Sequence, residues 1–358
     1  MAYTTIDDPS EYFTTLLYTG NATDDRNLTN DANAGDFQPD LLWIKERSST
    51  SSHQLHDSIR ESSKAVMSDN NAAEDVDANR VQAFQSNGFQ VGTASTVNQD
   101  GITMVAWQWK GTGGTRTAFA SEADNANNEY DLHANQAAGF SINAYVGTGA
   151  NSTVPHGLGA APDFVVTKQR SQGSRGWTTW TNAFSGTQAI DLNETGAVYT
   201  SATSWNSTVP SSSAVSLGTR IGTNEDGRNF IMYCFRSIKG YSKIGRYVGN
   251  GSANGPFIYT GFKPAWVLVK RFDTGSGFSG AWDIHDSTRG EGVNPTNESL
   301  IASATNVESD DQPLDFLSNG WKVRHDLQGA NISGGSYLYY AIAESPFVSS
   351  EGVPTTAR

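Results

Sequence analysis

The stretch that decides the fold is Pro39-Asp40-Leu41-Leu42-Trp43-Ile44-Lys45, which recurs as Pro162-Asp163-Phe164-Val165-Val166-Thr167-Lys168 and as Pro264-Ala265-Trp266-Val267-Leu268-Val269-Lys270. Each copy has a proline, then an apolar run, then a lysine six positions after the proline. Proline is tolerated at the first residue of a strand, and a continuous apolar run is typical of a strand buried on both faces. The recurrence predicts three tandem copies of one β-rich module.

Two further signals recur around these strands. A Tyr-x-Gly opening precedes each one, at Tyr18-Thr19-Gly20, Tyr145-Val146-Gly147 and Tyr247-Val248-Gly249. A glycine followed by an apolar strand closes each copy, and we align these closing segments as Gly101 to Lys110, Gly227 to Arg236 and Gly335 to Glu344. This alignment places Trp107 and Trp109 opposite Tyr233 and Phe235, and opposite Ala341 and Ala343.

The outer copies share a hairpin signal that the middle copy lacks. Asn87-Gly88 and Asn319-Gly320 each stand between two apolar runs, which is the strongest short-range signal of a β-hairpin. The middle copy has only Val215-Ser216-Leu217-Gly218 in this region. We therefore expect the middle module to have diverged.

These signals predict an all-β fold of three tandem, lectin-like or jelly-roll-type antiparallel β-sandwich modules. The expected division is an N-terminal arm at 1–12, the first module at 13–110, and a polar linker or long loop at 111–137. The second module then covers 138–241, the third covers 242–347, and a C-terminal tail covers 348–358. Repeats of this length exceed those of solenoids, so each module is expected to have its own core.

Composition narrows the classes of function. The formal net charge is −13 and no Lys/Arg cluster offsets it, which argues against nucleic-acid binding. No apolar run approaches the roughly 20 residues of a membrane helix, so no membrane insertion is expected. The N-terminus has neither the basic start nor the apolar segment of a signal peptide. The single cysteine, Cys234, lies in an apolar run and is expected to be a buried structural thiol.

The motif that most invites a catalytic interpretation is His56-Asp57-Ser58-Ile59-Arg60, which returns as His285-Asp286-Ser287-Thr288-Arg289. Consecutive strand residues point to opposite faces, so the His and the Asp of one motif cannot both serve its Ser. We expect the Asp to cap a turn and the Arg to bridge back to it. No catalytic residue, no metal ligand set and no cofactor is predicted, and the protein is expected not to be an enzyme.

Three tryptophans lie outside the repeated strands. Trp177, Trp180 and Trp205 stand in Ser/Thr/Gly-rich stretches of the middle module. Loops are where binding residues concentrate, and an exposed indole face can stack on a sugar ring. These residues are the predicted ligand-binding site for a glycan, the alternative being anchors at an interface between subunits.

The same motifs resemble those of a known family. Tandem modules with Tyr-x-Gly-Asn-Gly, Gly-Phe-x-Pro-x-Trp-Val and Phe-Leu-Ser-Asn-Gly are similar to virion structural proteins of tailed bacteriophages, often marine, commonly labelled tail fibre or structural protein. The resemblance is closest over Ile231 to Arg271. It implies a lectin-like β-sandwich and a place in the virion, with assembly in the cytoplasm of the bacterial host.

Three functions are open at this point. The first is an exposed component of the tail-fibre or receptor-binding kind, with glycan recognition and host attachment. The second is a capsid-decoration or head-fibre protein without a ligand. The third and least favoured is a glycan-degrading enzyme, for which the sequence offers no identifiable pair of facing carboxylates. Expected partners are other virion proteins, further copies of the chain in a homo-oligomer (a trimer being favoured), and a host-surface glycan.

Overall fold

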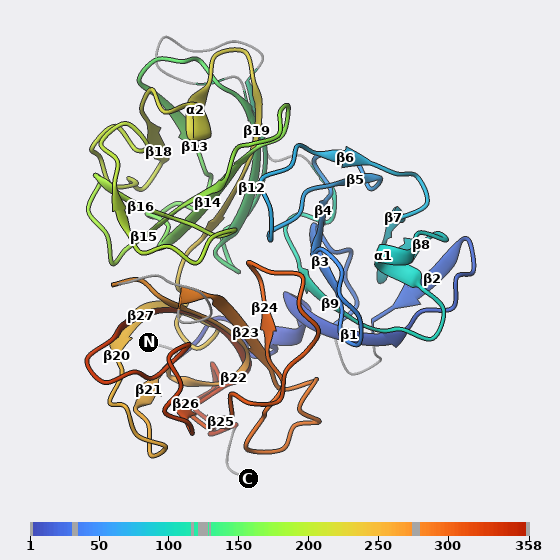
Figure 1. The fold of residues 1–358 in the computed structure, drawn as a ribbon, viewed down its shortest axis with the longest axis vertical. Coiled ribbons are helices and arrows are strands. Elements are labelled where there is room, and N and C mark those ends of the chain that lie inside the picture. Colours follow the sequence, from blue (N-terminus) through green and yellow to red (C-terminus); the bar gives the residue numbers. More distant parts are fainter. Residues whose placement is uncertain are drawn as a thin grey trace.

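The computed structural model describes residues 3–30, 35–115, 118–120, 128, 130–273 and 280–355. Over these residues the chain is almost entirely β-structure, and every pair of neighbouring strands is antiparallel. The predicted all-β sandwich class is therefore confirmed. The strands gather in three groups that follow one another along the chain and surround a common centre (Figure 1).

The first group begins after a short 3-10 helix, η1 (Pro9–Glu11), and contains two small sheets beside a four-stranded sheet of order β1-β9-β3-β4. Its elements are β1 (Phe13–Thr19), β2 (Arg26–Thr29), β3 (Leu41–Glu46), β4 (Gln54–Asp57), β5 (Lys64–Ala65), β6 (Asp75–Val76), β7 (Val81–Gln85), β8 (Gly88–Val91), α1 (Ser95–Asn98) and β9 (Thr103–Trp109).

The second group has the widest sheet, of order β10-β11-β12-β19-β14-β15-β16-β17, and a two-stranded sheet of β13 and β18. Its elements are β10 (Ala118–Ala120), β11 (Tyr130–Asn135), β12 (Phe140–Val146), β13 (Ser152–Pro155), β14 (Phe164–Gln169), β15 (Trp177–Thr181), β16 (Gln188–Asp191), β17 (Tyr199–Thr200), β18 (Ala214–Leu217), α2 (Ile221–Asn224) and β19 (Asn229–Phe235).

The third group has a five-stranded sheet of order β20-β27-β22-β23-β24 and a three-stranded sheet of order β21-β26-β25. Its elements are β20 (Ser242–Val248), β21 (Phe257–Tyr259), β22 (Phe262–Arg271), β23 (Trp282–Asp286), β24 (Leu300–Ile301), β25 (Leu314–Leu317), β26 (Gly320–Val323) and β27 (Ser336–Pro346).

The strand register shows which residues are equivalent between groups. The proline-led strand pairs with the closing strand at Trp43↔Trp107, Val166↔Tyr233 and Leu268↔Tyr340. The third closing segment therefore begins at Gly334, not at Gly335 as the sequence alignment predicted. Gly334 has a φ of +74°, and so does Gly101, the first residue of the first closing segment. The equivalent of Trp107 is Tyr340, and aromatic rings occupy this position in all three groups.

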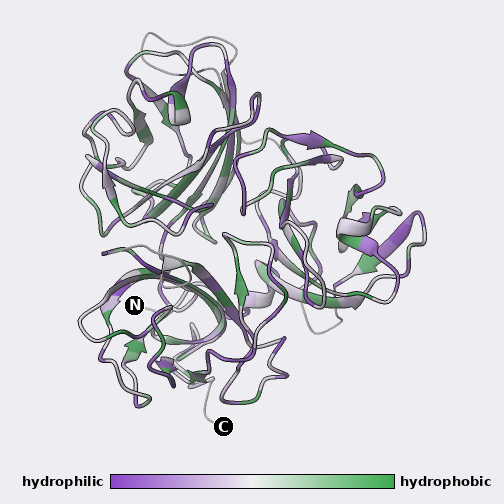
Figure 2. Cartoon of the chain, in the orientation of Figure 1, coloured by the Kyte–Doolittle hydropathy of each residue, from purple (hydrophilic) through white to green (hydrophobic). Residues whose placement is uncertain are grey.

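The outer groups have small three-stranded sheets packed on their large ones, which gives each a sandwich core of its own. Phe89 and Val97 lie in the core of the first group, and Phe316 and Trp321 lie in that of the third. The other face of each large sheet faces a larger cluster that draws residues from all three groups. Both faces of β3 are consequently covered, and all six of its residues are buried, as its continuous apolar run predicted. Figure 2 shows the hydrophobic residues concentrated on the strands and the hydrophilic ones on the peripheral loops.

The second group lacks an Asn-Gly hairpin, as predicted, because β18 pairs only with β13. The stretch 111–137, expected to be a polar linker or long loop, contains strands where the structure describes it. Here β10 and β11 extend the second large sheet beyond β12, and β11 pairs with β12 along its whole length. Residues 116–117, 121–127 and 129 of the expected linker lie outside the described residues. The other expected domain boundaries stay a prediction.

The repeated Tyr-x-Gly opening has a structural cause. In each group the Tyr hydroxyl donates to a backbone carbonyl just before a buried asparagine: Tyr18 to Val97, Tyr145 to Thr223 and Tyr247 to Ala330. The three asparagines, Asn98, Asn224 and Asn331, then bond the loop that follows the glycine. A Cβ on Gly20 would stand 2.0 Å from the carbonyl oxygen of Gln99, so only glycine allows this approach.

Candidate functional site

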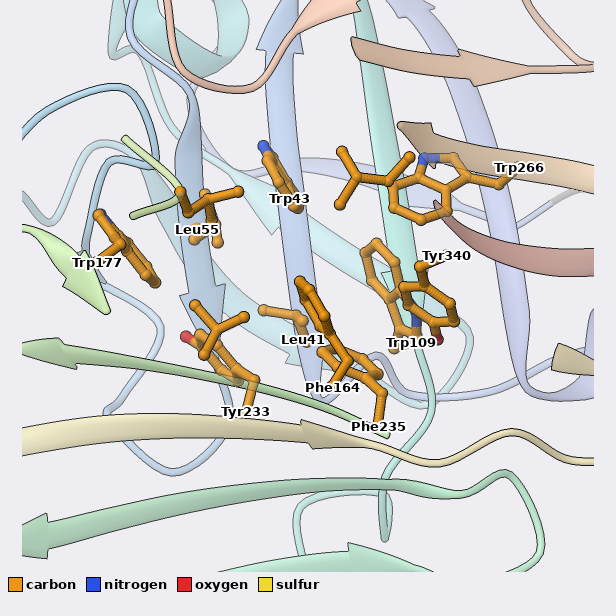
Figure 3. A pocket seen from close by; sticks show the side chains of 13 residues that line it. Leu41, Trp43, Leu55, Trp109, Phe164, Trp177, Tyr233, Phe235, Trp266 and Tyr340 are labelled. Atoms are coloured by element: carbon orange, nitrogen blue, oxygen red, sulfur yellow. The ribbon is translucent and has the colours of Figure 1, made fainter. Parts of the chain in front are cut away.

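The feature that brings residues of all three groups together is the centre of the molecule. Leu41, Phe164 and Trp266 are equivalent residues of β3, β14 and β22, and they meet there with aromatic rings from the closing strands (Figure 3). Trp109 packs edge-to-face on Trp266 with ring centroids 5.6 Å apart, and Phe235 lies 5.1 Å from Tyr340. The cavity left between these rings is about 30 Å³. An apolar space of this size holds at most one water molecule, so the centre is packing and not a ligand site.

Around this centre the groups contact one another in a cyclic order. Three equivalent side chains, at or just before the start of the strand after the proline-led one, form a hydrogen bond with a carbonyl of the neighbouring group. Trp177 Nε1 donates to Met67 O at 2.7 Å, Trp282 Nε1 donates to Asp191 O at 3.1 Å, and a ring nitrogen of His53 lies 2.9 Å from Ile301 O. The second group thus contacts the first, the third contacts the second, and the first contacts the third.

Networks of buried ionic side chains lie at two of these three junctions. At the junction of the first and second groups, Arg60 Nε lies 2.6 Å from Asp57 Oδ2, and both side chains are fully buried. Arg60 also reaches Glu74, which takes two hydrogen bonds from Arg170 of the second group. Tyr233 donates to Asp57 at 2.7 Å. Burial opposes the ionisation of Glu74, but the two guanidinium groups outweigh it and lower the pKa of this carboxyl.

The junction of the third and first groups repeats this network with equivalent residues. Arg289 Nε lies 2.5 Å from Asp286 Oδ2, and Arg289 reaches Glu308, which accepts from Arg47 of the first group. Trp107 Nε1 donates to Asp286 at 3.0 Å in the position that Tyr233 takes in the other network. The His-Asp-Ser-x-Arg motif is therefore structural: its Asp caps the turn, accepting from the Arg amide at 3.0 Å and 2.8 Å, and its Arg bridges back. This prediction is confirmed.

The junction of the second and third groups is apolar instead. Thr181 and Phe184 stand where the other junctions have the Asp and the Arg, and Val198 and Phe272 stand where they have the Glu and the second Arg. The backbone bond of the junction is kept, since Val198 N donates to Phe272 O at 2.9 Å, as Glu74 N does to Arg170 O. Phe184 packs edge-to-face on Phe272 with centroids 5.7 Å apart. Four residue differences thus make this contact hydrophobic where the other two are ionic.

The lysine that follows each proline-led strand is buried in all three groups. Lys45, Lys168 and Lys270 are fully covered and donate to backbone carbonyls: Lys45 to Glu46, Lys168 to Arg175, and Lys270 to Gly280 and Glu194. Desolvation lowers the pKa of Lys45 and Lys168 to about 8 and that of Lys270 to about 7. These lysines all satisfy backbone carbonyls in the strand end or the loop that follows, and Lys270 reaches the second group as well.

The three tryptophans predicted to bind a glycan do not lie in exposed loops. Trp177 and Trp180 belong to β15, and the exposed fractions of Trp177, Trp180 and Trp205 are 0%, 4% and 1%. Trp177 stacks on Tyr233 with centroids 6.4 Å apart, within the junction with the first group. Sequence reasoning mistook a polar strand, Thr178-Thr179 between two tryptophans, for a loop. The covered indole faces offer no stacking surface, so the reason for assigning these residues to a ligand is removed.

One cluster resembles a hydrolase triad in composition. Ser58 Oγ donates to Asp40 at 2.5 Å and lies 3.0 Å from Nδ1 of His133. In a catalytic triad the serine bonds one ring nitrogen and the carboxylate bonds the other, whereas here Asp40 also lies nearest Nδ1, at 3.6 Å. Asp40 accepts the amides of Gly111, Gly113 and Gly114 as well. Burial raises its pKa, but these hydrogen bonds outweigh burial and hold the pKa below the usual range.

The Asp40 carboxylate holds the backbone in place where the chain leaves the first strand group. Asp163, the equivalent of Asp40, accepts from the amide of Ser237 in the connection to the third group. Ala265 stands at this position in the third group. We conclude that Asp40 is an anchor for the exit of the chain. Cys234 offers no nucleophile either, because burial raises the pKa of its thiol.

Within the part of the chain that the structure describes, no three His, Cys, Asp or Glu side chains come together as metal ligands. No helix of the described residues has the length and the apolar character needed to cross a membrane.

The larger hollows lie on the surface. One of about 520 Å³ is bounded by Ile301, Glu308, Gln312 and Leu327 of the third group. Two more, of about 390 and 500 Å³, share a wall beside the N-terminal arm. The two hollows beside the arm carry no sequence signal, because they are formed by residues of the arm and of the second and third strand groups.

A comparison with protein families identifies the family to which the chain belongs. A family model described as a domain of unknown function (DUF7483) matches residues 8–346. The chain belongs to this family. The DUF7483 match runs through all three strand groups and all three junctions, so the family is defined by the whole block and not by one repeat. A comparison with curated proteins found no significant match.

Proposed function

We propose that this protein is a structural component of a bacteriophage virion, exposed on the particle, of the tail-fibre or receptor-binding kind. The observation that carries the proposal is the arrangement of three strand groups in one cyclic block with a dry aromatic centre. Titratable side chains within it are used for packing: the buried arginines, lysines and Asp40 all bond protein partners. Such a block suits the display of surface loops and not the turnover of a substrate.

The sequence resemblance supports the virion assignment, and the geometry supports a non-enzymatic role. Host attachment through a glycan, contact with other virion proteins and assembly in the host cytoplasm belong to the same proposal. A homo-oligomer also remains part of it. The internal cyclic arrangement gives one chain the three-way packing that a trimer of single modules would have.

The second candidate is a capsid-decoration or head-fibre protein. It is favoured by the compactness of the block, because the described residues include no coiled coil or short-period β-repeat of the kind that forms a fibre shaft.

Imaging of labelled particles tests the proposal and separates the two candidates. Antibody or gold label on the tail supports the fibre or receptor-binding function, and label spread over the shell supports decoration. Absence of the chain from purified particles refutes both. Release of reducing ends from host polysaccharide by the purified chain refutes the non-enzymatic role.

A further inference from the structure

We propose that the surface beside the N-terminal arm binds an acidic saccharide, a sugar ring that carries a carboxylate or phosphate group. The site, called the arm site below, consists of Tyr3, Arg236, Lys239, Lys243 and Tyr259. The biological role of the arm site rests on the proposed receptor-binding function. Binding itself is a property of the isolated chain.

The arm site is a shaped hollow. The two cavities of about 390 and 500 Å³ share Tyr3, Ser237 and Lys239 as a common wall. The arm is fixed there because the Tyr3 hydroxyl donates to Gly261 O at 2.7 Å, which holds it against the turn between β21 and β22. Together the cavities give room for more than one sugar ring.

Every charged side chain that lines the two cavities is basic. Arg236 belongs to the larger cavity, Lys243 to the smaller, and Lys239 to both. Their partners are neutral: Lys243 Nζ donates to Tyr259 O at 2.7 Å, and Arg236 donates to Leu158 O at 3.4 Å. A chain with a net charge of −13 has gathered three cations here without a carboxylate in the lining. Cations whose charge is not neutralised by a partner favour an anionic ligand through charge-assisted hydrogen bonds.

Two tyrosine rings provide the second part of the recognition. Lys239 Nζ stands 4.5 Å from the centroid of the Tyr3 ring, and Lys243 Nζ stands 5.1 Å from that of Tyr259. Tyr259 is 51% exposed. Burial raises the pKa of Tyr3 to about 12, so its hydroxyl stays uncharged at neutral pH. A ring face beside a cation suits a pyranose with an acidic group, and the Ser237 and Thr260 hydroxyls in the lining suit its neutral hydroxyls.

Two residues of the arm site, Lys243 and Tyr259, are not required by the repeated fold. By strand register, Lys243 is equivalent to Thr14 of β1 and Ser141 of β12, and Tyr259 is equivalent to Thr29 of β2. The Tyr-x-Gly and buried-lysine contacts recur in all three groups, whereas the cation and the exposed ring at these two positions occur in one. Arg236 differs in this respect, because its equivalent in the first group is also basic, Lys110. A single occurrence in a repeated framework indicates a function specific to this place.

The test is calorimetric titration of the full chain with three probes: a galacturonic acid tetrasaccharide, mannose 6-phosphate and neutral maltotetraose. We expect one or both acidic probes to bind and maltotetraose to bind at least tenfold more weakly. The acidic probe that binds more tightly identifies the group as carboxylate or phosphate. Affinity is expected to fall as NaCl is raised. Equal binding of the neutral probe, or no binding of either acidic one, overturns the proposal.

The double variant Lys239→Gln/Lys243→Gln is expected to lose at least tenfold in affinity. Its matched control, Lys64→Gln/Arg228→Gln, removes the same charge from side chains outside the two cavities and should bind like the wild type. Tyr259→Ala should weaken binding several-fold and Tyr259→Phe should restore it, because the ring face is what matters. An unchanged affinity in the lysine variant, with an unchanged circular dichroism spectrum, refutes the site. Binding by the chain together with normal adsorption of particles that lack it refutes the receptor function and supports the site.

Discussion

Removing Arg60 should destabilise the protein far more than removing an exposed cation of the same geometry. Arg60 and Asp57 are three residues apart, fully buried and 2.6 Å apart, so Arg60→Ala leaves the Asp57 carboxylate buried beside Tyr233 without its counter-charge. Loss of one partner of a buried ion pair costs about 3–5 kcal/mol. Lys64 and Glu61 are also three residues apart, but their side chains are 26% and 72% exposed. Lys64→Ala should cost below about 1 kcal/mol.

A second variant replaces the whole ionic network of this junction by apolar residues. It separates the cost of leaving the Asp57 carboxylate unpaired from a general loss of packing. The variant Asp57→Thr/Arg60→Phe/Glu74→Val/Arg170→Phe copies the apolar junction, whose corresponding residues are Thr181, Phe184, Val198 and Phe272. Replacing a buried ionic network by packed hydrophobic residues is often neutral or stabilising by about 1–4 kcal/mol.

The assay is equilibrium urea unfolding followed by tryptophan fluorescence. We expect a large loss for Arg60→Ala and recovery of most of it in the fourfold variant. A cost for Arg60→Ala near that of Lys64→Ala would refute the reasoning, and so would a fourfold variant as unstable as Arg60→Ala.

Three other predictions concern packing, backbone and pH. Trp177→Ala should cost about 3–5 kcal/mol in urea unfolding because its buried indole fills a junction, and Trp177→Phe should cost less; a cost below about 1 kcal/mol for Trp177→Ala would contradict its burial. Gly20→Ala should destabilise more than Gly101→Ala, because the new Cβ meets Gln99 O at 2.0 Å whereas at Gly101 (φ +74°) nothing lies within 4 Å; equal melting temperatures would contradict this. Burial lowers the pKa of His53 and His56 to about 3, whereas the unfolded chain takes up these protons near pH 6.5. Stability should therefore fall as pH drops from about 6.5 towards 3, and His56→Gln should reduce that slope by up to about 1.4 kcal/mol per pH unit, checked by urea unfolding at pH 7 and 5.

The sequence was sufficient for the fold class and for features set by local pattern. The apolar run after each proline predicted strands buried on both faces, and the Asp and Arg of the His-Asp-Ser-x-Arg motif bond each other as a turn of that spacing allows. The closing strand of the third group was misaligned by one residue. A one-residue slip exchanges the two faces of a strand, and Gly334-Gly335 offered two starting points that only the register with β22 distinguishes.

Contacts between groups were beyond the sequence, because they join residues far apart in the chain, 96 positions for Glu74 and Arg170 and 261 for Arg47 and Glu308. Glu74 and Glu308 stand in polar loops and carry no local sign of their arginine partners. Trp177 and Trp180 lie in a strand, β15, with polar residues between them. This strand is buried because a neighbouring group covers it. The arm site was missed for the same reason: its tyrosines come from positions 3 and 259, which the fold alone brings together.

The different chemistry of the three junctions has a consequence for symmetry. In an assembly of identical chains every interface must be the same, so any substitution appears at all of them at once. Joining the repeats in one polypeptide removes that constraint, and each interface and each outer face can then change alone. The molecule keeps the packing of a ring yet has one face unlike the others. A ligand recognised only there would be bound once per chain, so strong attachment would depend on how many chains are brought together in one assembly.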